Sequence, residues 1–532
     1  MKRMMWAVAL LAAGVAGAHG ASAQEAVDLD MTARIRQEAF QRSQVVATLD
    51  HLTDVIGPRL TLSPAMLEAN RWTRAKFTEW GLANVHDEAV DNLGRGWQFT
   101  DASVDMLSPR AMPLHALPKA WTPGTSGPVE GEAIFVKLES KDDLAKWKGR
   151  LRGKIVFTDE LRTYKPNEKS DFQRYAAADL DELLAYPLPK ARDVDPAMLA
   201  RFRARMELAP QLNQFLIDEG VVATVSISSW NDGIVRVMGG GSRKAGESVG
   251  VPALVMMAEH YNTVMRALER KEPVKLRLNV DARFLGETNQ PGYNTIAEIP
   301  GSGPQKDEVV MLGAHMDSWH AGSGASDNGA GVAVMMEAMR ILKAVGARPN
   351  RTIRVALWTG EEQGLLGSQD YVSRHIGRFE EPKDPEEKAM PAFFRQHKGK
   401  LLRGQDWGKV SAYFNLDNGS GRIRGIYAQD NLAVAPIFAE WLKPWRDVGA
   451  TIVTQRNTGS TDHVSFDAVG VPGFQFVQDQ LDYFSHVHHT DLDVQDHAVP
   501  DDLKQASAIV ASFVYNTAMR PARLPRKQVV DN

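Results

Sequence analysis

In the second half of the chain, short apolar runs alternate with longer segments whose apolar residues recur every three or four positions. The runs predict buried strands and the longer segments predict helices with one apolar face. Strand–helix alternation predicts an α/β fold with a mainly parallel, mixed sheet flanked by helices. The expected strands are Val309–Leu312, Thr352–Trp358, Val410–Leu416 and Gly473–Val477, and the expected helices are Gly331–Val345, Leu365–His375 and Asp501–Met519.

The first half of the chain has a different pattern. Residues 29–90 have helical spacing, with a break at Ile56-Gly-Pro-Arg59 and a second helix from Ser63-Pro64 to Gly81. Short β-like runs follow from about residue 98 and resume at Val221–Ser228 and Val251–Met257, around a polar, helix-favouring insertion at about 160–218. The charged segment 377–408 is expected to be a surface insertion. The predicted units are a leader at 1–23, a first part of the main domain at 24–123, an inserted β-rich domain at 124–276 and the rest of the main domain at 277–532.

The N-terminus has the features of a cleavable signal peptide. Lys2 and Arg3 precede the apolar run Trp6–Ala18, and Ala21-Ser-Ala23 forms an A-x-A cleavage site. Since no later segment approaches about 18 uninterrupted apolar residues, the mature form is expected not to enter a membrane. We therefore expect a periplasmic or secreted protein that begins at Gln24.

Composition narrows the possible partners and the possible metal ligands. The 532 residues suggest two or three domains, at roughly 150 residues each. Lys and Arg number 62 against 66 Asp and Glu, so the basic surplus of a nucleic-acid-binding protein is missing and no nucleic acid partner is expected. The chain has no cysteine, so any metal must be held by His, Asp, Glu or backbone oxygen.

Acidic residues and histidines follow the four strands predicted in the second half. Because the carboxyl ends of parallel strands meet at one edge of a sheet, we expect these side chains to share one site. The segments are Gly313-Ala-His315-Met-Asp317 with Ser326-Asp327-Asn-Gly-Ala-Gly331, Trp358-Thr-Gly-Glu361-Glu362, Asn415-Leu-Asp417, and His486-Val-His488-His489-Thr490-Asp491-Leu-Asp493.

This set contains more ligands than one zinc ion needs, and two neighbouring ions would need a shared carboxylate. Asp327 suits the shared position, because it begins a helix after a glycine-rich loop. The other ligands are expected to divide as His315 with Asp417 on one ion and Glu362 with His489 on the other. The residual positive charge would make a metal-bridging hydroxide available near neutral pH.

Two further acids have expected roles beside the ligands. Adjacent residues on a turning backbone point in different directions, so Glu361 can face the water while Glu362 binds metal. Glu361 would then act as the general base and pass the proton to the leaving amine. Asp317 is expected to accept the imidazole N–H of His315 and fix its tautomer.

Taken together, these segments resemble the di-zinc exopeptidases of the aminopeptidase and carboxypeptidase Q family, whose relatives include glutamate carboxypeptidases. The resemblance extends through residues 277–520 and includes Ile56-Gly-Pro-Arg59, and Gly153-Lys-Ile-Val-Phe157 resembles part of a protease-associated domain. It implies the same roles: two zinc ions, His315, Asp327, Glu362, Asp417 and His489 as ligands, Glu361 as base and Asp317 beside the ligands.

Some assignments stay open at this point. The family pattern of His followed by Ser or Thr favours His489 over His488 as the ligand, and Asp462, His463 and Tyr483 are candidates for substrate binding. Arg422 and Arg424 either contact a substrate carboxylate or belong to a solvated loop.

The leading hypothesis is an exported zinc-dependent exopeptidase acting on dipeptides or short peptides. Amino- and carboxyl-end specificity are both open, as is a homodimer. One alternative is a non-catalytic, receptor-like binding protein on the same scaffold, which predicts broken ligand positions. Another is a one-zinc acyl transferase resembling glutaminyl cyclases, which predicts a metal count near one.

Overall fold

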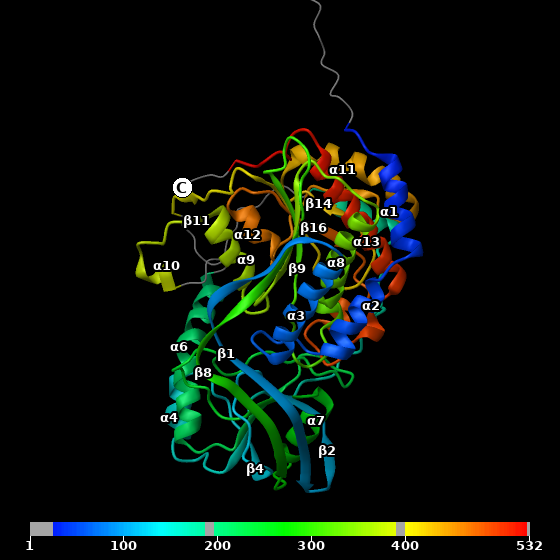
Figure 1. Cartoon of the computed structure of the whole chain (residues 1–532). Coiled ribbons are helices and arrows are strands. Elements are labelled where there is room, and N and C mark those ends of the chain that lie inside the picture. The colour runs from blue at the N-terminus through cyan, green and yellow to red at the C-terminus, as the bar shows by residue number, and fades with distance from the viewer. Residues whose placement is uncertain (1–24, 187–195, 390–398, 529–532) are drawn as a thin grey trace, which may run out of the picture.

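The computed structural model describes residues 25–186, 196–389 and 399–528 (Figure 1). The predicted signal peptide at 1–23 therefore lies outside the described residues. Within the described ranges no helix is both long enough and apolar enough to cross a membrane.

One large mixed sheet, with 14 strands among the described residues, runs through the molecule. Its main path has the order β15-β14-β16-β13-β9-β10-β8-β4-β5-β6-β7-β3, and β1 pairs with β8 and β2. The strands of this path are β3 (Ala116–Pro118), β4 (Val129–Phe135), β5 (Lys154–Phe157), β6 (Ala223–Ile227), β7 (Ala253–Met256), β8 (Lys275–Ile299), β9 (Val309–His315), β10 (Thr352–Trp358), β13 (Val410–Asn415), β14 (Ile423–Tyr427), β15 (Ile452–Thr454) and β16 (Gly473–Gln478). Beside it lie β1 (Ala83–Ser108) and β2 (Met112–Leu114), and a separate pair is formed by β11 (Gly377–Phe379) and β12 (Leu401–Arg403).

Helices cover both faces of the sheet. Helices α8 and α13 pack against one face and share a large apolar core with β9, β13 and β16, while α12 and η3 lie with a second cluster on the other face (Figure 1). The longer helices are α1 (Leu29–Gln41), α2 (Val45–Asp50), α3 (Pro64–Glu79), α4 (Lys141–Trp147), α5 (Ala177–Leu184), α6 (Pro196–Asp218), α7 (Ala258–Glu269), α8 (Ala330–Ala344), α9 (Leu366–Tyr371), α10 (Pro385–Ala389), α11 (Ala435–Leu442), α12 (His463–Ala468) and α13 (Pro500–Met519). Short helical turns are η1 (His51–Ile56), η2 (Ala325–Gly329), η3 (Val372–Ile376), η5 (Leu432–Val434), η6 (Lys443–Val448), η7 (Tyr483–Val487) and η8 (Gln495–His497).

The four strands predicted to carry the site are adjacent and parallel. β16 pairs with β13, β13 with β9, and β9 with β10, all in parallel register. Every residue of β9, β13 and β16 is buried, which agrees with their continuous apolar runs. The expected α/β fold with a large, mainly parallel sheet flanked by helices is confirmed, and the four carboxyl ends meet at one edge.

A long antiparallel pair joins the two halves of the sheet. β1 and β8 have 26 and 25 residues and pair from Ala83 opposite Glu298 to Ser108 opposite Lys275 (Figure 1). The helical expectation for residues 29–90 is thus wrong from residue 83 onward. Pairing with β8 decides this segment: Asp87, for example, accepts a hydrogen bond of 2.9 Å from the hydroxyl of Thr295 on β8. Tertiary pairing here overrides weak local propensity.

The region 124–276 contributes the parallel strands β4, β5, β6 and β7 together with α4 to α7. Its apolar cluster is separate from the core around α8, but β8 takes part in both. The boundaries at 124 and 276 remain a prediction. The insertion at 160–218 contains α5 and α6, and the segment 377–408 contains β11, α10 and β12.

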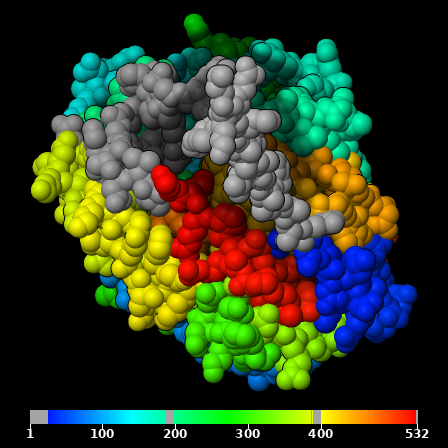
Figure 2. Space-filling model, turned by 90° about the horizontal axis from the view of Figure 1, so that it is seen from above, coloured from blue at the N-terminus to red at the C-terminus, as the bar shows by residue number. Residues whose placement is uncertain are grey.

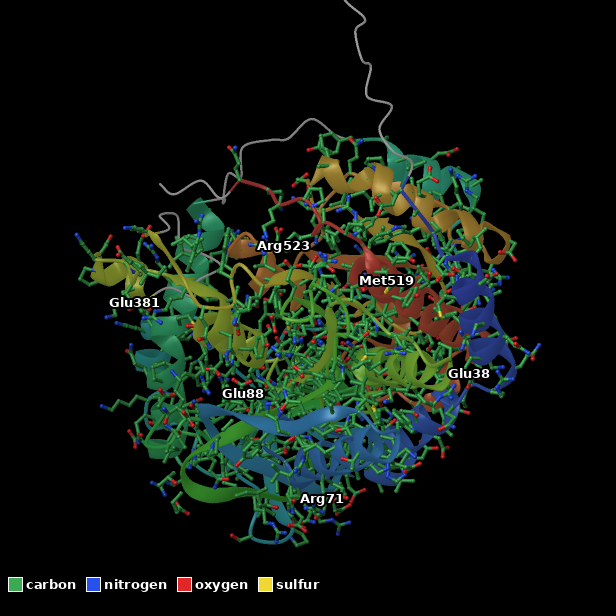
Figure 3. The ribbon with its side chains drawn as sticks, turned by 45° about the horizontal axis from the view of Figure 1, so that its top comes forward. Glu38, Arg71, Glu88, Glu381, Met519 and Arg523 are labelled. Carbon is green, nitrogen blue, oxygen red and sulfur yellow. The ribbon has the colours of Figure 1, made fainter. Side chains whose placement is uncertain are left out.

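The two ends of the described chain pack on the main domain. Figure 3 places Glu38 on α1 near the side where α13 lies, and its carboxylate accepts a hydrogen bond of 2.8 Å from Arg340 of α8. Figure 2 shows the C-terminal segment crossing one face between the N-terminal helix and the segment near residue 400. Arg520 pairs with Glu25 at 2.9 Å, and Arg526 donates to the carbonyl of Trp407 at 2.7 Å.

Candidate metal centre

The predicted ligands come together at the carboxyl edge of the central strands. β9 ends at His315, Glu362 follows β10, and Asp417 follows β13. Asp327 lies in η2, between β9 and α8, and His489 lies in the loop after β16. Parallel pairing of the strands therefore gathers residues that are up to 174 positions apart in the chain.

His315 faces two of the predicted carboxylates with one ring nitrogen. Its Nε2 lies 3.3 Å from an oxygen of Asp327 and 3.3 Å from an oxygen of Asp417. Its Nδ1 donates to the backbone carbonyl of Asp317 at 2.9 Å, so Nε2 is the nitrogen that faces the two acids. The side chain is 1% exposed, and although burial lowers the pKa of His315, Asp417 and its acidic neighbours raise it well above its usual value.

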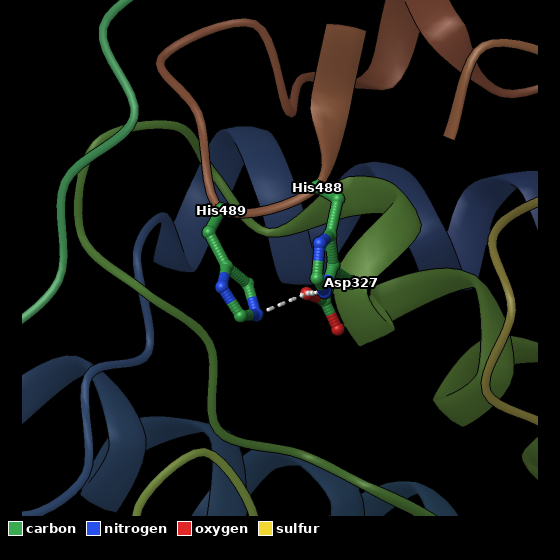
Figure 4. Close-up of side chains that lie close together, drawn as sticks. All are labelled: Asp327, His488 and His489. Carbon is green, nitrogen blue, oxygen red and sulfur yellow. Dashed lines mark ion pairs between the residues drawn. The ribbon is translucent and has the colours of Figure 1, made fainter. Parts of the chain in front are cut away.

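The second half of the centre is built around the other oxygen of Asp327. His489 Nε2 lies 3.2 Å from Asp327 Oδ2 and 3.1 Å from Glu362 Oε2, and Figure 4 shows the contact with Asp327. Burial opposes charge on His489, but Glu362 and Asp327 outweigh it and raise its pKa to about 10. Burial and the charge of Asp327 raise the pKa of Glu362 to about 7. Asp327 therefore lies between two His-containing groups, as a shared ligand would.

The donor set and its burial fit zinc. Two groups of possible ligands share Asp327: one contains His315 and Glu362, the other His488 and His489. Among the described residues, one buried oxygen of Glu362 has no hydrogen-bond donor, and buried Asp327 Oδ2 has no well-aligned donor although His489 Nε2 lies 3.2 Å from it. A buried carboxylate oxygen without a partner is costly unless a cation or donor satisfies it. Imidazole nitrogen and carboxylate oxygen are zinc ligands, and the residues present would satisfy such an ion.

Asp317 organises the turn that carries both glutamates. Its carboxylate accepts the backbone N–H of Glu361 at 3.2 Å, that of Glu362 at 3.3 Å and the hydroxyl of Thr61 at 2.9 Å. Its distance to His315 Nδ1 is 3.8 Å, longer than a hydrogen bond. The expected contact between His315 and Asp317 is thus made by the backbone carbonyl, while the carboxylate positions the Glu361–Glu362 turn.

Glu361 is held beside the centre in an environment that favours its protonated form. Burial raises its pKa well above the usual value, the charge of His315 opposes this, and Asp417 and Asp462 add to it. A carboxyl group with a raised pKa can both accept and return a proton near neutral pH. This suits the base predicted from the adjacent pair of glutamates.

The geometry favours His489 over His488 as a ligand. His488 Nε2 is 3.8 Å from Asp327 Oδ2, against 3.2 Å for His489, and the two rings lie 3.8 Å apart between centroids (Figure 4). Burial lowers the pKa of His488 to about 4, so the ring stays neutral. His489 itself has a left-handed backbone, with φ of 63°, which needs support from its surroundings.

The three substrate-binding candidates lie close to the metal centre, but they do not line the cleft beside Glu362 that is described below. Asp462 is fully buried, neither of its oxygens has a hydrogen-bond donor among the described residues, and burial raises its pKa to about 7. His463 Nε2 donates a hydrogen bond of 3.0 Å to the carbonyl of Thr458, and burial lowers the pKa of His463 to about 4. The neutral ring therefore stabilises the loop that carries it. Tyr483 is buried, with its ring centroid 5.1 Å from that of His488.

Arg422 and Arg424 are part of the fold and not of the cleft. Arg424 pairs with Asp479 at 3.0 Å and donates to the carbonyl of Gly449, also at 3.0 Å. Arg422 pairs with Asp502 at 3.2 Å. Arg424 lies in β14, whereas Arg422 lies in the loop directly before it with a side chain that is 40% exposed, so a loop position fits Arg422 and neither arginine lines the cleft.

Sequence reasoning gave no role to Arg59 and Asp493, which support the loop around Asp327. Arg59 is fully buried and donates to five backbone carbonyls, three of them in the segment Met316–Gly324. Asp493 accepts the N–H groups of Ser326 at 2.6 Å and Asp327 at 3.1 Å. Both residues lie in the motifs that carry the family resemblance, and this was the sequence signal that could have pointed to them. No local pattern in the sequence indicates a structural role for either.

Two segments from the region 124–276 hold the loop that carries His489. On one side Gln173 and Leu481 exchange backbone hydrogen bonds of 2.8 and 2.7 Å, and Arg174 pairs with Asp479 at 3.0 Å and Asp502 at 2.6 Å. On the other side the backbone of Val237 donates to the carbonyl of His489 at 3.2 Å. The loop after β16 is therefore held from both sides.

A cleft of about 340 Å³ opens beside Glu362. A glycine-rich turn forms one wall: a Cβ at Gly241 would lie 1.8 Å from the carbonyl oxygen of Trp121, so only glycine allows this packing. The cleft is lined by Trp121, Gly239, Gly241, Ser242, Arg243, Lys244, Trp319, Glu362 and Gln363.

The chain is similar to known peptidases over nearly its whole length. It is 26% identical to mouse carboxypeptidase Q over 505 residues, covering 95% of this chain and 90% of that protein. It is also 26% identical to aminopeptidase YwaD of Bacillus subtilis, over 53% of this chain and 54% of that protein. The crystal structure of a Peptidase M28 precursor from Shewanella amazonensis has a TM-score of 0.64 at 25% identity, covering 94% of this chain and 99% of that one.

Residues 294–514 match Peptidase family M28, and this range contains every predicted metal ligand together with Glu361 and Asp317. Residues 294–514 therefore form a domain similar to Peptidase family M28, and the chain as a whole is similar to carboxypeptidase Q.

Proposed function

We propose that the protein is an exported zinc-dependent exopeptidase that hydrolyses dipeptides or short peptides and holds two zinc ions. The observation that carries this is the placement of Asp327 between His315, at 3.3 Å, and His489, at 3.2 Å, with Glu362 and Asp417 completing two ligand groups. A single shared carboxylate flanked by two His–carboxylate sets is the arrangement that two neighbouring ions require.

When bound, zinc would polarise the scissile carbonyl and acidify a water molecule. The side chain of Glu361 would take the proton of that water and deliver it to the leaving amine. The carboxylate of Asp317 accepts hydrogen bonds from the backbone N–H groups of Glu361 and Glu362. These bonds would fix the turn so that the side chain of the base and that of the metal ligand point in different directions. His315 is kept in one tautomer by the carbonyl of Asp317.

Two features argue against the alternatives. A non-catalytic binding protein would not need both an intact ligand set and a buried Glu361, yet all are present. A one-zinc acyl transferase would leave part of the His and carboxylate set without a function. The similar proteins include carboxypeptidase Q and an aminopeptidase, both exopeptidases by name, which supports hydrolysis at a chain end.

Metal analysis combined with a panel of free, N-blocked and C-blocked dipeptides tests the proposal. We expect about two zinc ions per chain, hydrolysis of free dipeptides, and loss of activity on chelation with recovery on adding zinc. A metal content near zero in carefully purified protein would favour the binding protein, and a content near one with cyclising activity would favour the acyl transferase.

Export has its own test, independent of activity. The full-length chain expressed in a Gram-negative host should yield a periplasmic product whose N-terminal residue is Gln24. A product that retains Met1 and stays in the cytoplasm would contradict export and leave the proposed chemistry unaffected.

A further inference from the structure

Arg243 lines the cleft beside Glu362 and has no ion-pair partner among the described residues. Its Nε donates to the carbonyl of Leu93 at 2.7 Å, and its backbone carbonyl accepts from Arg95 at 2.7 Å, so its position is fixed. The described part of the chain gives its guanidinium no ion pair, and burial lowers its pKa, with Glu247 only partly opposing this. A desolvated guanidinium of this kind is stabilised by a carboxylate or phosphate.

A second arginine, Arg236, lies at the metal end of the site. Its Nη2 is 3.2 Å from Nδ1 of His489, and its buried Nε has no acceptor among the described residues. A buried guanidinium N–H without an acceptor is stabilised by a ligand that supplies one.

The charges around the cleft discriminate between the two ends of a peptide. Among its lining residues Arg243 and Lys244 are cationic, with Lys244 paired to Glu247 at 3.9 Å, and the one acid, Glu362, is a proposed metal ligand. A free amino group entering here would meet like charge. A free carboxylate would meet the guanidinium of Arg243, which has no ion pair among the described residues, in the two-pronged geometry that guanidinium groups offer.

We infer that Arg243 binds the free C-terminal carboxylate of the peptide substrate, and that Arg236, next to His489, adds a second positive charge at the metal end of the site. The inference rests on the proposed function, because it places the scissile bond at the metal centre next to the cleft. It makes the protein selective for substrates with an unblocked C-terminus, and it assigns specificity to the region 124–276, which supplies both arginines.

Kinetics with Ala-Ala and its amide, Ala-Ala-NH2, on the zinc-loaded full chain test this. The wild type should prefer Ala-Ala. Arg243→Ala should lower kcat/KM for Ala-Ala by about 10- to 100-fold, mainly through KM, and change Ala-Ala-NH2 little. Arg243→Lys should have a kcat/KM for Ala-Ala between those of the wild type and Arg243→Ala. Arg270→Ala removes an equal charge from an exposed pair with Glu272 outside the cleft, and should leave both rates unchanged.

Binding supplies a readout apart from turnover. Calorimetry should show N-acetylalanine binding to the wild type and weakening in Arg243→Ala, with no such change in Arg270→Ala. Equal losses on Ala-Ala and Ala-Ala-NH2, or a wild type that prefers the amide, would overturn the inference. If the wild type cleaves neither peptide although zinc is bound, the proposed function fails, while the N-acetylalanine comparison still decides the role of Arg243.

Discussion

The backbone N–H of Asp327 donates a hydrogen bond of 3.1 Å to the side-chain carboxylate of Asp493. The same carboxylate accepts the N–H of Ser326 at 2.6 Å, so a residue from the His489 loop fixes the backbone of the proposed shared ligand. Burial and the charge of Asp327 raise the pKa of Asp493 to about 8. The two acids are thus linked through the backbone rather than through their side chains.

Asp493→Asn should weaken zinc binding by about 10- to 100-fold, because an amide replaces one accepting oxygen with a donor that faces a backbone N–H. Competition with a chromogenic chelator measures the affinity. Asp501→Asn, at a highly exposed position, is the control and should bind zinc as the wild type does. Unchanged affinity in Asp493→Asn would show that the two N–H groups do not depend on this carboxylate.

Glu361→Gln should reduce kcat by about 10²- to 10⁴-fold while zinc content stays at the wild-type level, because the amide cannot accept the proton. Glu362→Gln is the matched comparison: it removes the neighbouring carboxylate and should reduce zinc content as well. Metal analysis and rates measured on the same preparations separate the two effects. A fully active Glu361→Gln variant would refute the assigned base.

Alanine substitutions at His488 and His489 should have different effects on zinc content. His489→Ala removes the nitrogen that lies within 3.2 Å of both Asp327 and Glu362, so zinc content should fall by about one ion per chain. His488→Ala removes a neutral ring at 3.8 Å and should keep the full content. The reverse pattern would exchange the two assignments.

Arg174→Ala should loosen the loop after β16, because its partners Asp479 and Asp502 are buried and would lose a shared cation. We expect a loss of about 1–3 kcal/mol in unfolding free energy, measured with urea, and faster proteolysis of the loop. Arg422→Ala removes a cation from the same Asp502, but Arg422 lies directly before β14 and not in the region 124–276. Arg422→Ala should lower the unfolding free energy without weakening zinc binding. Arg174→Ala should lower the unfolding free energy and also weaken zinc binding.

His320 should make the metal-free protein less stable as pH falls. It is buried and donates to the carbonyl of Pro118 at 2.7 Å, and burial lowers its pKa from 6.5 to about 4. Between these values the unfolded chain binds more protons, so unfolding free energy falls from pH 7 toward pH 4, by up to about 3 kcal/mol for this group. Urea unfolding in the presence of chelator should show a shallower pH dependence for His320→Gln. An equal slope in the variant would exclude His320 as a contributor.

The centre was predictable because its residues follow four strands whose apolar runs are unmistakable. Thr352–Trp358 was predicted with the observed ends, and His315, Glu362 and Asp417 lie where a parallel sheet must bring them. The pairing of strands that supply no motif was not predictable. Residues 83–90 have no strong preference of their own, and their partner on β8 is about 200 residues away.

Residues that act on the backbone of distant loops were the hardest to find. Arg59 bonds to carbonyls more than 250 positions away, and carbonyls have no sequence signature. Arg236 and Arg243 are also unremarkable in sequence, since only the folded structure shows that neither forms an ion pair within the described ranges. Charge counts cannot reveal whether an individual cation is neutralised.

The β1–β8 pair has a consequence for protein engineering. Because β8, paired along its length with β1, joins β10 of the metal-binding half at one end and β4 of the region 124–276 at the other, that region is not a module that can be exchanged at two short linkers. Grafting it onto another peptidase would require transplanting the two strands with their pairing register intact. Variation of substrate preference in this scaffold is therefore expected to proceed by changes within loops, such as the glycine-rich turn before Arg243, rather than by exchange of whole units.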